Sequence, residues 1–263
     1  MNEQSRANQR AWNHRAYEFW NRSNGTPSVF AAKLLQNPDT NLSVRYRGLL
    51  GNLKGKRILN ALGSNGRKAV PLCLMGAEVT IVDISEENRR YALELAECAG
   101  VSLKYVMADL ATYKDDSFDG YFDIVFSEGG VLHYFSDLDS LFQKLSSYLK
   151  VKGRLILNDF HPYRKMLFPE IGTNGNYFDN GLHDGPVAYE DQFDESERSD
   201  FPKCLLRYYT IGEVVTAIGS SGLWIKEMQE IPKDGMESVP GEFTIVAEKL
   251  PGDSDVHITS RCS

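Results

Sequence analysis

The sequence predicts an α/β protein with a doubly wound, mostly parallel, seven-stranded sheet whose last strand is antiparallel. Short apolar runs alternate with helix-length segments over residues 56–160, which is the pattern of consecutive βα units. A glycine-containing turn follows the first run, and an aspartate ends the second. The last two apolar runs are joined by residues 231–242, a linker too short for a helical crossover, so we expect them to pair antiparallel.

The composition is that of an ordinary globular protein, and it argues against a nucleic acid or a membrane as a partner. The chain has 263 residues and a formal net charge of −7, so it lacks the Lys/Arg excess on which nucleic-acid binding depends. No apolar run reaches membrane-spanning length and the N-terminus is polar, so we expect no membrane partner and a cytoplasmic location. The cysteines lack metal-ligand spacing, so we expect neither a metal site nor a disulfide framework.

Residues 1–55 predict a helical cap that precedes the sheet. Aromatic residues recur at helical spacing from residue 3 to residue 20, and Trp12 and Trp20 share one face of this helix. Packing onto the domain is the commoner role of such a face, and ligand contact is the alternative. Two further helices are expected at 27–36, where Thr26 is a good N-cap, and at 42–50.

Residues 56–160 predict a core of five strands and the helices between them. The first helix begins in the glycine turn, the second has Ser85 as its N-cap, and the third carries the clearest apolar stripe in the chain. The strands are expected at 58–62, 79–83, 103–107, 122–126 and 154–158, and the helices at 67–75, 85–99 and 137–149.

The rest of the chain divides into an irregular part and a regular part. Periodicity fails over 161–205, which is rich in Gly, Asn, Asp and aromatic residues, so we expect an irregular insertion that forms a lid over the substrate. Residues 206–249 predict a helix followed by the antiparallel strand pair, with the reversed strand at the edge of the sheet. The tail 250–263 is polar and is expected to be disordered.

Candidate ligand-binding groups stand at the ends of four predicted strands. The turn after the first strand would present backbone N–H groups at a helix start, and an acid at the end of the second strand can accept both hydroxyls of a ribose. The carboxyl ends of parallel strands meet at one edge of the sheet, where doubly wound folds bind ligands. The pattern therefore predicts an adenosine-binding site, with Gly63, Ser64, Asn65, Asp83, Asp109 and Glu128 as its candidate residues.

Over about residues 56–247 this arrangement resembles the class I S-adenosylmethionine-dependent methyltransferases, which have a Rossmann-like fold. Residues 58–66 resemble their first motif, and residues 82–85 resemble their ribose-binding strand end. The resemblance implies S-adenosyl-L-methionine as the cofactor, with Asp83 on the ribose, Ile84 against the adenine and Asp109 accepting from the adenine amino group. The segment 11–20 is similar to the helix that many members fold over the cofactor. Trp12, Trp20, Leu110 and Glu128 complete the implied cofactor-binding set.

The first motif departs from the family pattern, which has an acid followed by glycines at alternate positions. Asn60, Leu62, Ser64 and Gly66 occupy those positions here, although Ser64 keeps a hydroxyl for the donor. An NAD(P)-binding oxidoreductase is an alternative because it also needs a glycine turn and an acid about 20 residues later, but its further glycines would fall at Asn65 and Lys68. A second alternative is a non-catalytic module that binds a nucleoside or a partner protein.

The expected reaction is methyl transfer to a small molecule, with natural-product intermediates and protein side chains as the alternative acceptors. Neither the charge balance nor any Asn/Asp-Pro-Pro-Tyr/Phe motif points to a nucleic-acid substrate. A hydroxyl acceptor must lose a proton, for which a histidine of near-neutral pKa is suited. His133, after the fourth strand, and His161, after the fifth, are the candidate catalytic residues, and a purely structural role is the alternative for each.

Overall fold

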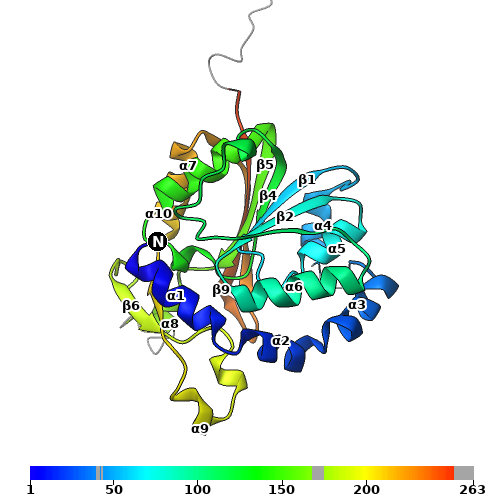
Figure 1. Cartoon of the computed structure of the whole chain (residues 1–263). Coiled ribbons are helices and arrows are strands. Elements are labelled where there is room, and N and C mark those ends of the chain that lie inside the picture. The colour runs from blue at the N-terminus through cyan, green and yellow to red at the C-terminus, as the bar shows by residue number, and fades with distance from the viewer. Residues whose placement is uncertain (40–41, 43, 168–174, 252–263) are drawn as a thin grey trace, which may run out of the picture.

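The computed structural model describes residues 1–39, 42, 44–167 and 175–251. A seven-stranded sheet with the order β3-β2-β1-β4-β5-β9-β8 runs through the centre of the molecule (Figure 1). The first five of these strands in chain order are parallel, which confirms the predicted fold class. The strands are β1 (Arg57–Ala61), β2 (Glu78–Asp83), β3 (Lys104–Met107), β4 (Phe122–Ser127), β5 (Leu149–Phe160), β8 (Leu223–Lys233) and β9 (Met236–Lys249).

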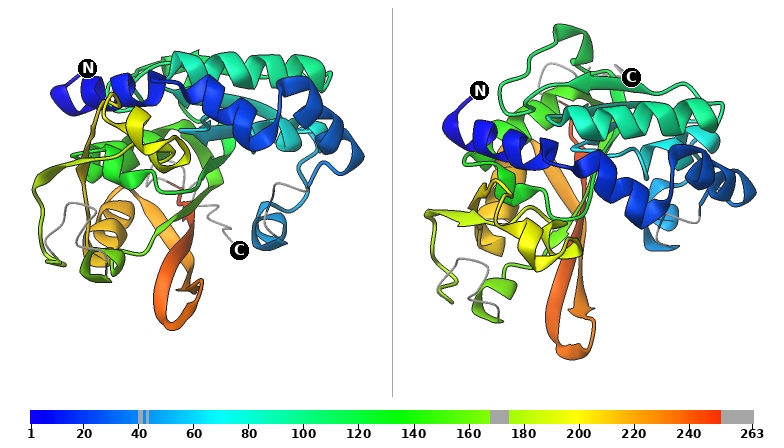
Figure 2. Two further views of the ribbon diagram at one scale, coloured as in Figure 1. Left: turned by 90° about the horizontal axis from the view of Figure 1, so that it is seen from below. Right: turned by 60° about the horizontal axis from the view of Figure 1, so that its bottom comes forward.

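The reversed strand is the last in the chain, as predicted, but it does not lie at the edge of the sheet. β9 pairs antiparallel with both β5 and β8, so β8 forms the edge. The reason lies in their side chains. Phe243 to Ala247 of β9 are buried, whereas in β8 only Leu223 is buried and the other residues are exposed or half-buried, which suits a solvent-facing edge. The β8–β9 hairpin continues beyond the sheet as a protruding arm (Figure 2).

Helices cover both faces of the sheet because neighbouring strand residues point to opposite sides. Ile58 packs with α4, α5 and α6, whereas the adjacent Leu59 packs with α7 and α10. α6 begins at the predicted N-cap Ser85, and α10 begins with a capping box between Thr210 and Glu213. The bounds are α4 (Val44–Leu50), α5 (Ala69–Leu74), α6 (Glu86–Cys98), α7 (Leu138–Tyr148) and α10 (Ile211–Ser220).

The N-terminal segment forms two helices where the sequence predicted one from 3 to 20. The helix is interrupted at Arg15, which has a left-handed backbone with φ 57°. This interruption separates α1 (Glu3–Asn13) from α2 (Ala16–Asn24). The Tyr189 hydroxyl stabilises this interruption, because it lies within hydrogen-bond distance of two carbonyl oxygens there, that of Ala11 at 3.1 Å and that of His14 at 2.7 Å. Local periodicity could not reveal a partner so distant in the chain. α3 (Pro27–Gln36) begins at Thr26, as predicted.

The insertion contains regular structure, which differs from the irregular segment expected over 161–205. β6 (Leu182–Gly185) and β7 (Cys204–Arg207) pair antiparallel as a second sheet, and α8 (Arg164–Leu167) and α9 (Glu195–Arg198) are short helices. Elements of four residues are too short to produce a readable period. The insertion lies against α1 and α2 (Figure 2). Most of the tail predicted at 250–263 falls outside the described residues.

Within the part of the chain that the structure describes, no helix is long and apolar enough to cross a membrane. The same residues contain no group of three or more His, Cys, Asp or Glu side chains placed to hold a metal ion.

Candidate active site

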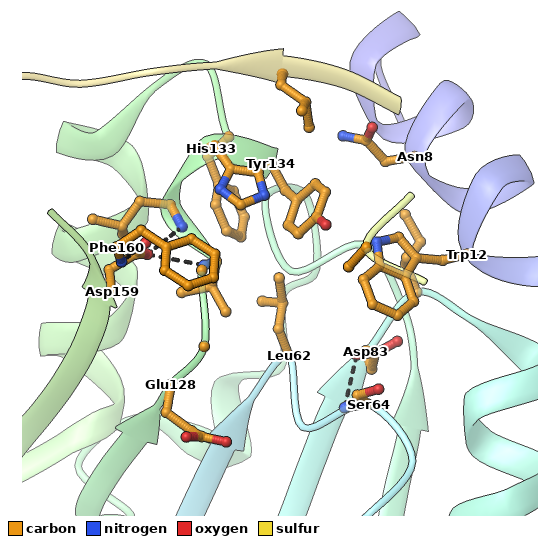
Figure 3. Close-up of a pocket in the computed structure, with 18 of the residues that line it drawn as sticks. Asn8, Trp12, Leu62, Ser64, Asp83, Glu128, His133, Tyr134, Asp159 and Phe160 are labelled. Atoms are coloured by element: carbon orange, nitrogen blue, oxygen red, sulfur yellow. Dashed lines mark hydrogen bonds between the residues drawn. The ribbon is translucent and has the colours of Figure 1, made fainter. Parts of the chain in front are cut away.

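A cavity of about 510 Å³ lies beyond the carboxyl ends of the central strands, under a roof formed by α1 and the insertion (Figure 3). This volume lies within the range of about 300–1,000 Å³ typical of small-molecule sites. Eleven of the twelve predicted site residues line the cavity: Trp12, Trp20, Gly63, Ser64, Asp83, Ile84, Asp109, Leu110, Glu128, His133 and His161. Asn65 does not line it. Its side chain is buried within the turn and accepts a hydrogen bond from the Arg67 N–H at 3.3 Å.

The first turn keeps the backbone of a glycine turn without all of its glycines. Leu62 and Ser64 have left-handed backbones with φ 53° and φ 49°, and they occupy two of the positions where the family pattern expects glycine. Each such residue costs roughly 1–2 kcal/mol of backbone strain. Gly63 is required for packing rather than for ligand approach, because a Cβ there would lie 2.7 Å from Asn60 Oδ1.

The strain in this turn leads to a stability prediction. The Ser64 hydroxyl oxygen is buried without a hydrogen-bond partner among the described residues, so removing the hydroxyl breaks no hydrogen bond with them. We expect Ser64→Gly to raise the free energy of unfolding by roughly 0.5–1 kcal/mol, measured by urea denaturation. The exposed Ser102, whose φ is not positive, provides the control, since glycine there should destabilise. A loss of stability in Ser64→Gly would contradict the strain interpretation.

Asp83 holds the same turn from the end of β2. Its Oδ2 accepts the N–H of Ser64 and its Oδ1 the N–H of Ser85, both at 3.0 Å. Burial raises the pKa of Asp83, while these two hydrogen bonds oppose the rise. Asp83 as a residue is only 7% exposed, and its side chain faces the cavity beside Trp12 (Figure 3), so it is not merely a solvated carboxylate at a helix entry.

The other two predicted acids also face the cavity, and both have protein partners. Asp109 Oδ1 accepts the N–H of Ala111 at 3.0 Å, which shapes the turn after β3. Glu128 lies at the end of β4, with its Oε1 3.6 Å from Arg67 Nη2 and 3.6 Å from Lys68 Nζ. These contacts draw the start of α5 toward the end of β4.

Asp159, at the end of β5, is a site residue that the sequence analysis missed. Its Oδ2 accepts the N–H groups of Val131 and Leu132 at 2.9 and 2.8 Å, and its Oδ1 accepts that of Phe160 at 2.6 Å. Burial raises the pKa of Asp159 to about 6, although the hydrogen bonds from these N–H groups lower it. The carboxyl group thereby fixes the loop that carries His133. Its position at a strand end, like that of Asp83, was the available signal.

His133 projects into the cavity from the short 3-10 helix Leu132–Tyr134 (Figure 3). Its ring centroid lies 4.2 Å from that of Tyr134 and 6.0 Å from that of Tyr208. Burial, assisted by the charge of Arg164, lowers the pKa of His133 to about 4, so the imidazole is neutral at neutral pH. It therefore offers an unprotonated nitrogen to the cavity.

His161 lines the cavity too, but its nitrogens face protein groups. Nδ1 accepts the N–H of Tyr163 at 3.1 Å, and Nε2 lies 2.8 Å from Glu230 Oε1 without hydrogen-bond alignment. This environment matches the structural alternative for His161. Of the two predicted histidines, His133 is the better placed to act on a ligand.

The pKa of His133 predicts an acid-dependent loss of stability. At pH values between its pKa of about 4 in the folded protein and its ordinary pKa of 6.5, this histidine is protonated in the unfolded chain but not in the folded protein. The free energy of unfolding therefore falls as the pH falls through this range. We expect the stability of His133→Phe relative to the wild type to rise by about 1–2 kcal/mol between pH 7 and pH 5. The raised pKa of Asp159 has the opposite effect on the pH dependence of stability, but Asp159 is present in both proteins, so its effect cancels in the comparison. Equal changes in their urea midpoints would show that the imidazole titrates normally.

The roof connects both halves of the cavity through hydrogen bonds from α1. The Asn8 side chain and the Leu205 backbone bond reciprocally at 2.8 and 3.1 Å, and the Gln4 side-chain N–H donates to the His133 carbonyl at 3.3 Å. The Ser85 hydroxyl donates to the Trp12 carbonyl at 2.8 Å. The same helix therefore contacts the end of β2, the His133 loop and β7.

Comparison with known proteins agrees with this architecture. Residues 61–157 match the methyltransferase domain family. No curated protein sequence matches the chain. The fold is similar to that of an S-adenosylmethionine-dependent methyltransferase from Mesorhizobium loti, with 20% identity and a TM-score of 0.61 over 82% of this chain and 100% of the other.

Two other similar structures contain the demethylated cofactor. Magnesium protoporphyrin IX methyltransferase from Synechocystis PCC 6803, with bound SAH, has 18% identity and a TM-score of 0.61, covering 94% of this chain and 100% of its own. The 1,6-didemethyltoxoflavin-N1-methyltransferase from Burkholderia thailandensis, with S-adenosylhomocysteine and its substrate, has 16% identity and a TM-score of 0.56, covering 94% and 87%. Residues 61–157 therefore match a methyltransferase domain, and the chain as a whole has the fold of these methyltransferases.

Proposed function

We propose that this methyltransferase uses S-adenosyl-L-methionine to methylate a small molecule held in the cavity, with His133 accepting the proton that the acceptor loses. The observation that carries this proposal is the single cavity that joins the turn of Ser64 and Asp83 to the imidazole of His133. The proposed donor-binding groups and a neutral imidazole thus line the same cavity.

The residues of the β1–β2 half fit the donor. Ser64 offers a buried hydroxyl without a described protein partner, and Asp83 keeps lone pairs beyond its two backbone bonds for the ribose hydroxyls. Ile84 and Leu110 provide apolar walls for the adenine, Asp109 an acceptor for its amino group, and Glu128 an acid for the donor's ammonium group. Trp12 and Trp20 add aromatic surface to this half. When bound, S-adenosyl-L-methionine supplies a methyl group activated by a sulfonium.

The chain itself contributes alignment, exclusion of water and proton acceptance. Alignment of the reacting atoms can provide several kcal/mol of the barrier reduction, about 7–11 in favourable cases. The roof limits water near the reacting atoms. A neutral imidazole nitrogen of His133 takes the proton from a hydroxyl acceptor, and the hydrogen bonds of Asp159 keep its loop in position.

A small molecule is the preferred acceptor because the cavity is roofed. α1 and the insertion close over the strand ends, which leaves a pocket rather than a groove for a polymer. Two proteins of similar fold are named for small-molecule substrates, magnesium protoporphyrin IX and 1,6-didemethyltoxoflavin.

Titration calorimetry with S-adenosyl-L-methionine, its demethylated product and NAD tests the proposal. We expect the first two to bind with a Kd of roughly micromolar, about 8 kcal/mol, and NAD to show no saturable heat. Binding of NAD alone would favour an oxidoreductase. Absence of heat with all three ligands, in folded protein, would contradict nucleoside binding altogether.

We also propose that the insertion acts as a lid. A lid opens to admit ligands and is ordered by them. We expect amide hydrogen exchange in residues 175–207 to slow when the demethylated product is added, with the largest change near Leu205. Asn8→Ala should accelerate exchange there by removing the reciprocal bond. Equal protection with and without ligand would make the insertion a fixed structural element.

A further inference from the structure

The part of the cavity next to His133 combines aromatic walls with an arginine. His133, Phe160, Arg164 and Tyr208 all line it. Phe160 projects into the cavity from the end of β5, with Leu62 between it and Trp12 (Figure 3). Although apolar, Phe160 is 39% exposed. This wall lies across the cavity from Asp83, at the end of β2, and from Ser64, in the turn after β1 (Figure 3).

Arg164 is held over Phe160 by ring stacking. Its guanidinium carbon lies 4.0 Å from the centre of the Phe160 ring. The ring in turn packs on Gly130, where a Cβ would lie only 2.3 Å from Phe160 Cε2. Any side chain at residue 130 would displace this ring. The backbone of the His133 loop therefore supports the ring that supports the guanidinium.

The guanidinium has no hydrogen bond or ion pair with any other residue that the structure describes, although Arg164 is half-buried. The carboxyl group of Asp159, on the same cavity wall, already accepts three backbone N–H groups. Arg207, which also lines the cavity, differs: its Nη2 lies 3.0 Å from Glu213 Oε1, and its Nη1 donates to the Ser136 carbonyl. Of these two cavity arginines, only Arg164 keeps its donors for a ligand.

Burial lowers the pKa of Arg164, and the nearby Tyr208, Glu242 and Asp159 oppose this shift without reversing it, so the guanidinium is only partly compensated for its lost hydration. The His133 ring adjoins Phe160, because a Cβ at Gly130 would lie 3.2 Å from His133 Cε1 as well as against Phe160, and the charge of Arg164 helps to lower the pKa of His133. A carboxylate fits such a site, because the planar fork of N–H donors matches its two oxygens. A phosphate dianion is less suited to one arginine.

We propose that Arg164, stacked on Phe160, binds a carboxylate of the methyl acceptor, which makes the substrate a small carboxylic acid whose apolar or aromatic body lies against the cavity walls. This inference rests on the proposed function. It assigns the His133 side of the cavity to the acceptor, and it places the acceptor's nucleophile within the region of the neutral imidazole.

Matched acid and amide probes test the inference in the full chain saturated with S-adenosylhomocysteine. We would titrate benzoate, 4-hydroxybenzoate, phenylacetate and hexanoate, each against its neutral amide, with phenyl phosphate as the phosphate probe. We expect at least one acid to bind about tenfold to a hundredfold more tightly than its amide. Arg164→Gln should abolish that preference and leave S-adenosylhomocysteine binding unchanged. Arg207→Gln, which removes an already paired guanidinium, should retain the preference.

Other outcomes overturn the inference. The first is that no acid binds better than its amide, and the second is that the preference survives in Arg164→Gln. A preference for phenyl phosphate over every acid would replace the carboxylate by a phosphate. Loss of S-adenosylhomocysteine binding in Arg164→Gln, with an unchanged melting temperature, would assign the arginine to the donor's own carboxylate. Failure of the wild type to bind S-adenosylhomocysteine would instead contradict the proposed function.

Discussion

Replacing His133 by alanine should lower the turnover of a hydroxyl acceptor by about 10²-fold, the lower end of the 10²–10⁴-fold range of general base catalysis. The lower end is expected because burial lowers the pKa of His133 to about 4, which makes the imidazole a weak base although it is unprotonated at neutral pH. The measurement is the rate of S-adenosylhomocysteine release with an acceptor identified by screening.

His161→Ala is the matched control for this experiment. His161 lines the same cavity, but its nitrogens face Tyr163 and Glu230, so we expect a smaller effect on turnover. Donor affinity should barely change in either variant. Unchanged turnover in His133→Ala would mean that proximity alone carries the reaction, or that the acceptor is an amine or carbon atom that needs no base.

Replacing Asp83 by alanine should weaken binding of the methyl donor by about 1.5–3 kcal/mol for each strong hydrogen bond to a ribose hydroxyl. The same change leaves the N–H groups of Ser64 and Ser85 without their acceptor, so the turn also loses its support. Calorimetry measures the affinity, and its stoichiometry separates weak binding from unfolding.

Asp109→Ala provides the comparison, since the adenine edge has other possible partners on the cavity wall. We expect it to weaken donor binding less than Asp83→Ala does. Donor affinity that is unchanged in Asp83→Ala would reduce Asp83 to a structural support of the turn after β1 and would remove the ribose from this strand end.

The sequence predicted the parallel core well because its signals are local. The short apolar runs, the N-cap at Ser85 and the acids after the second, third and fourth strands are each recognised from neighbouring residues. The short linker between the last two strands was sufficient to predict that they pair antiparallel. It could not specify which strand of the hairpin joins β5, because that depends on which one is apolar on both faces.

The features that the sequence analysis missed depend on contacts between distant segments. The break at Arg15 is stabilised by Tyr189, and the loop of His133 is fixed by Asp159. Asn65 was assigned to the site because it lies in the glycine turn, but the turn directs its side chain into the protein. Leu62 is the opposite case: a large side chain occupies a position where the family pattern has glycine, and the backbone there is still left-handed.

A crystal structure of the chain with S-adenosylhomocysteine would test the central claim most directly, which is that the donor lies beyond β1 and β2 with its sulfur toward His133. We expect density for the ribose at the Asp83 carboxyl group, for the adenine between Ile84 and Leu110, and for the sulfur on the side of the cavity that His133 faces. Density for the nucleoside elsewhere, or a cavity in which Leu62 and Phe160 leave no room for it, would contradict the account.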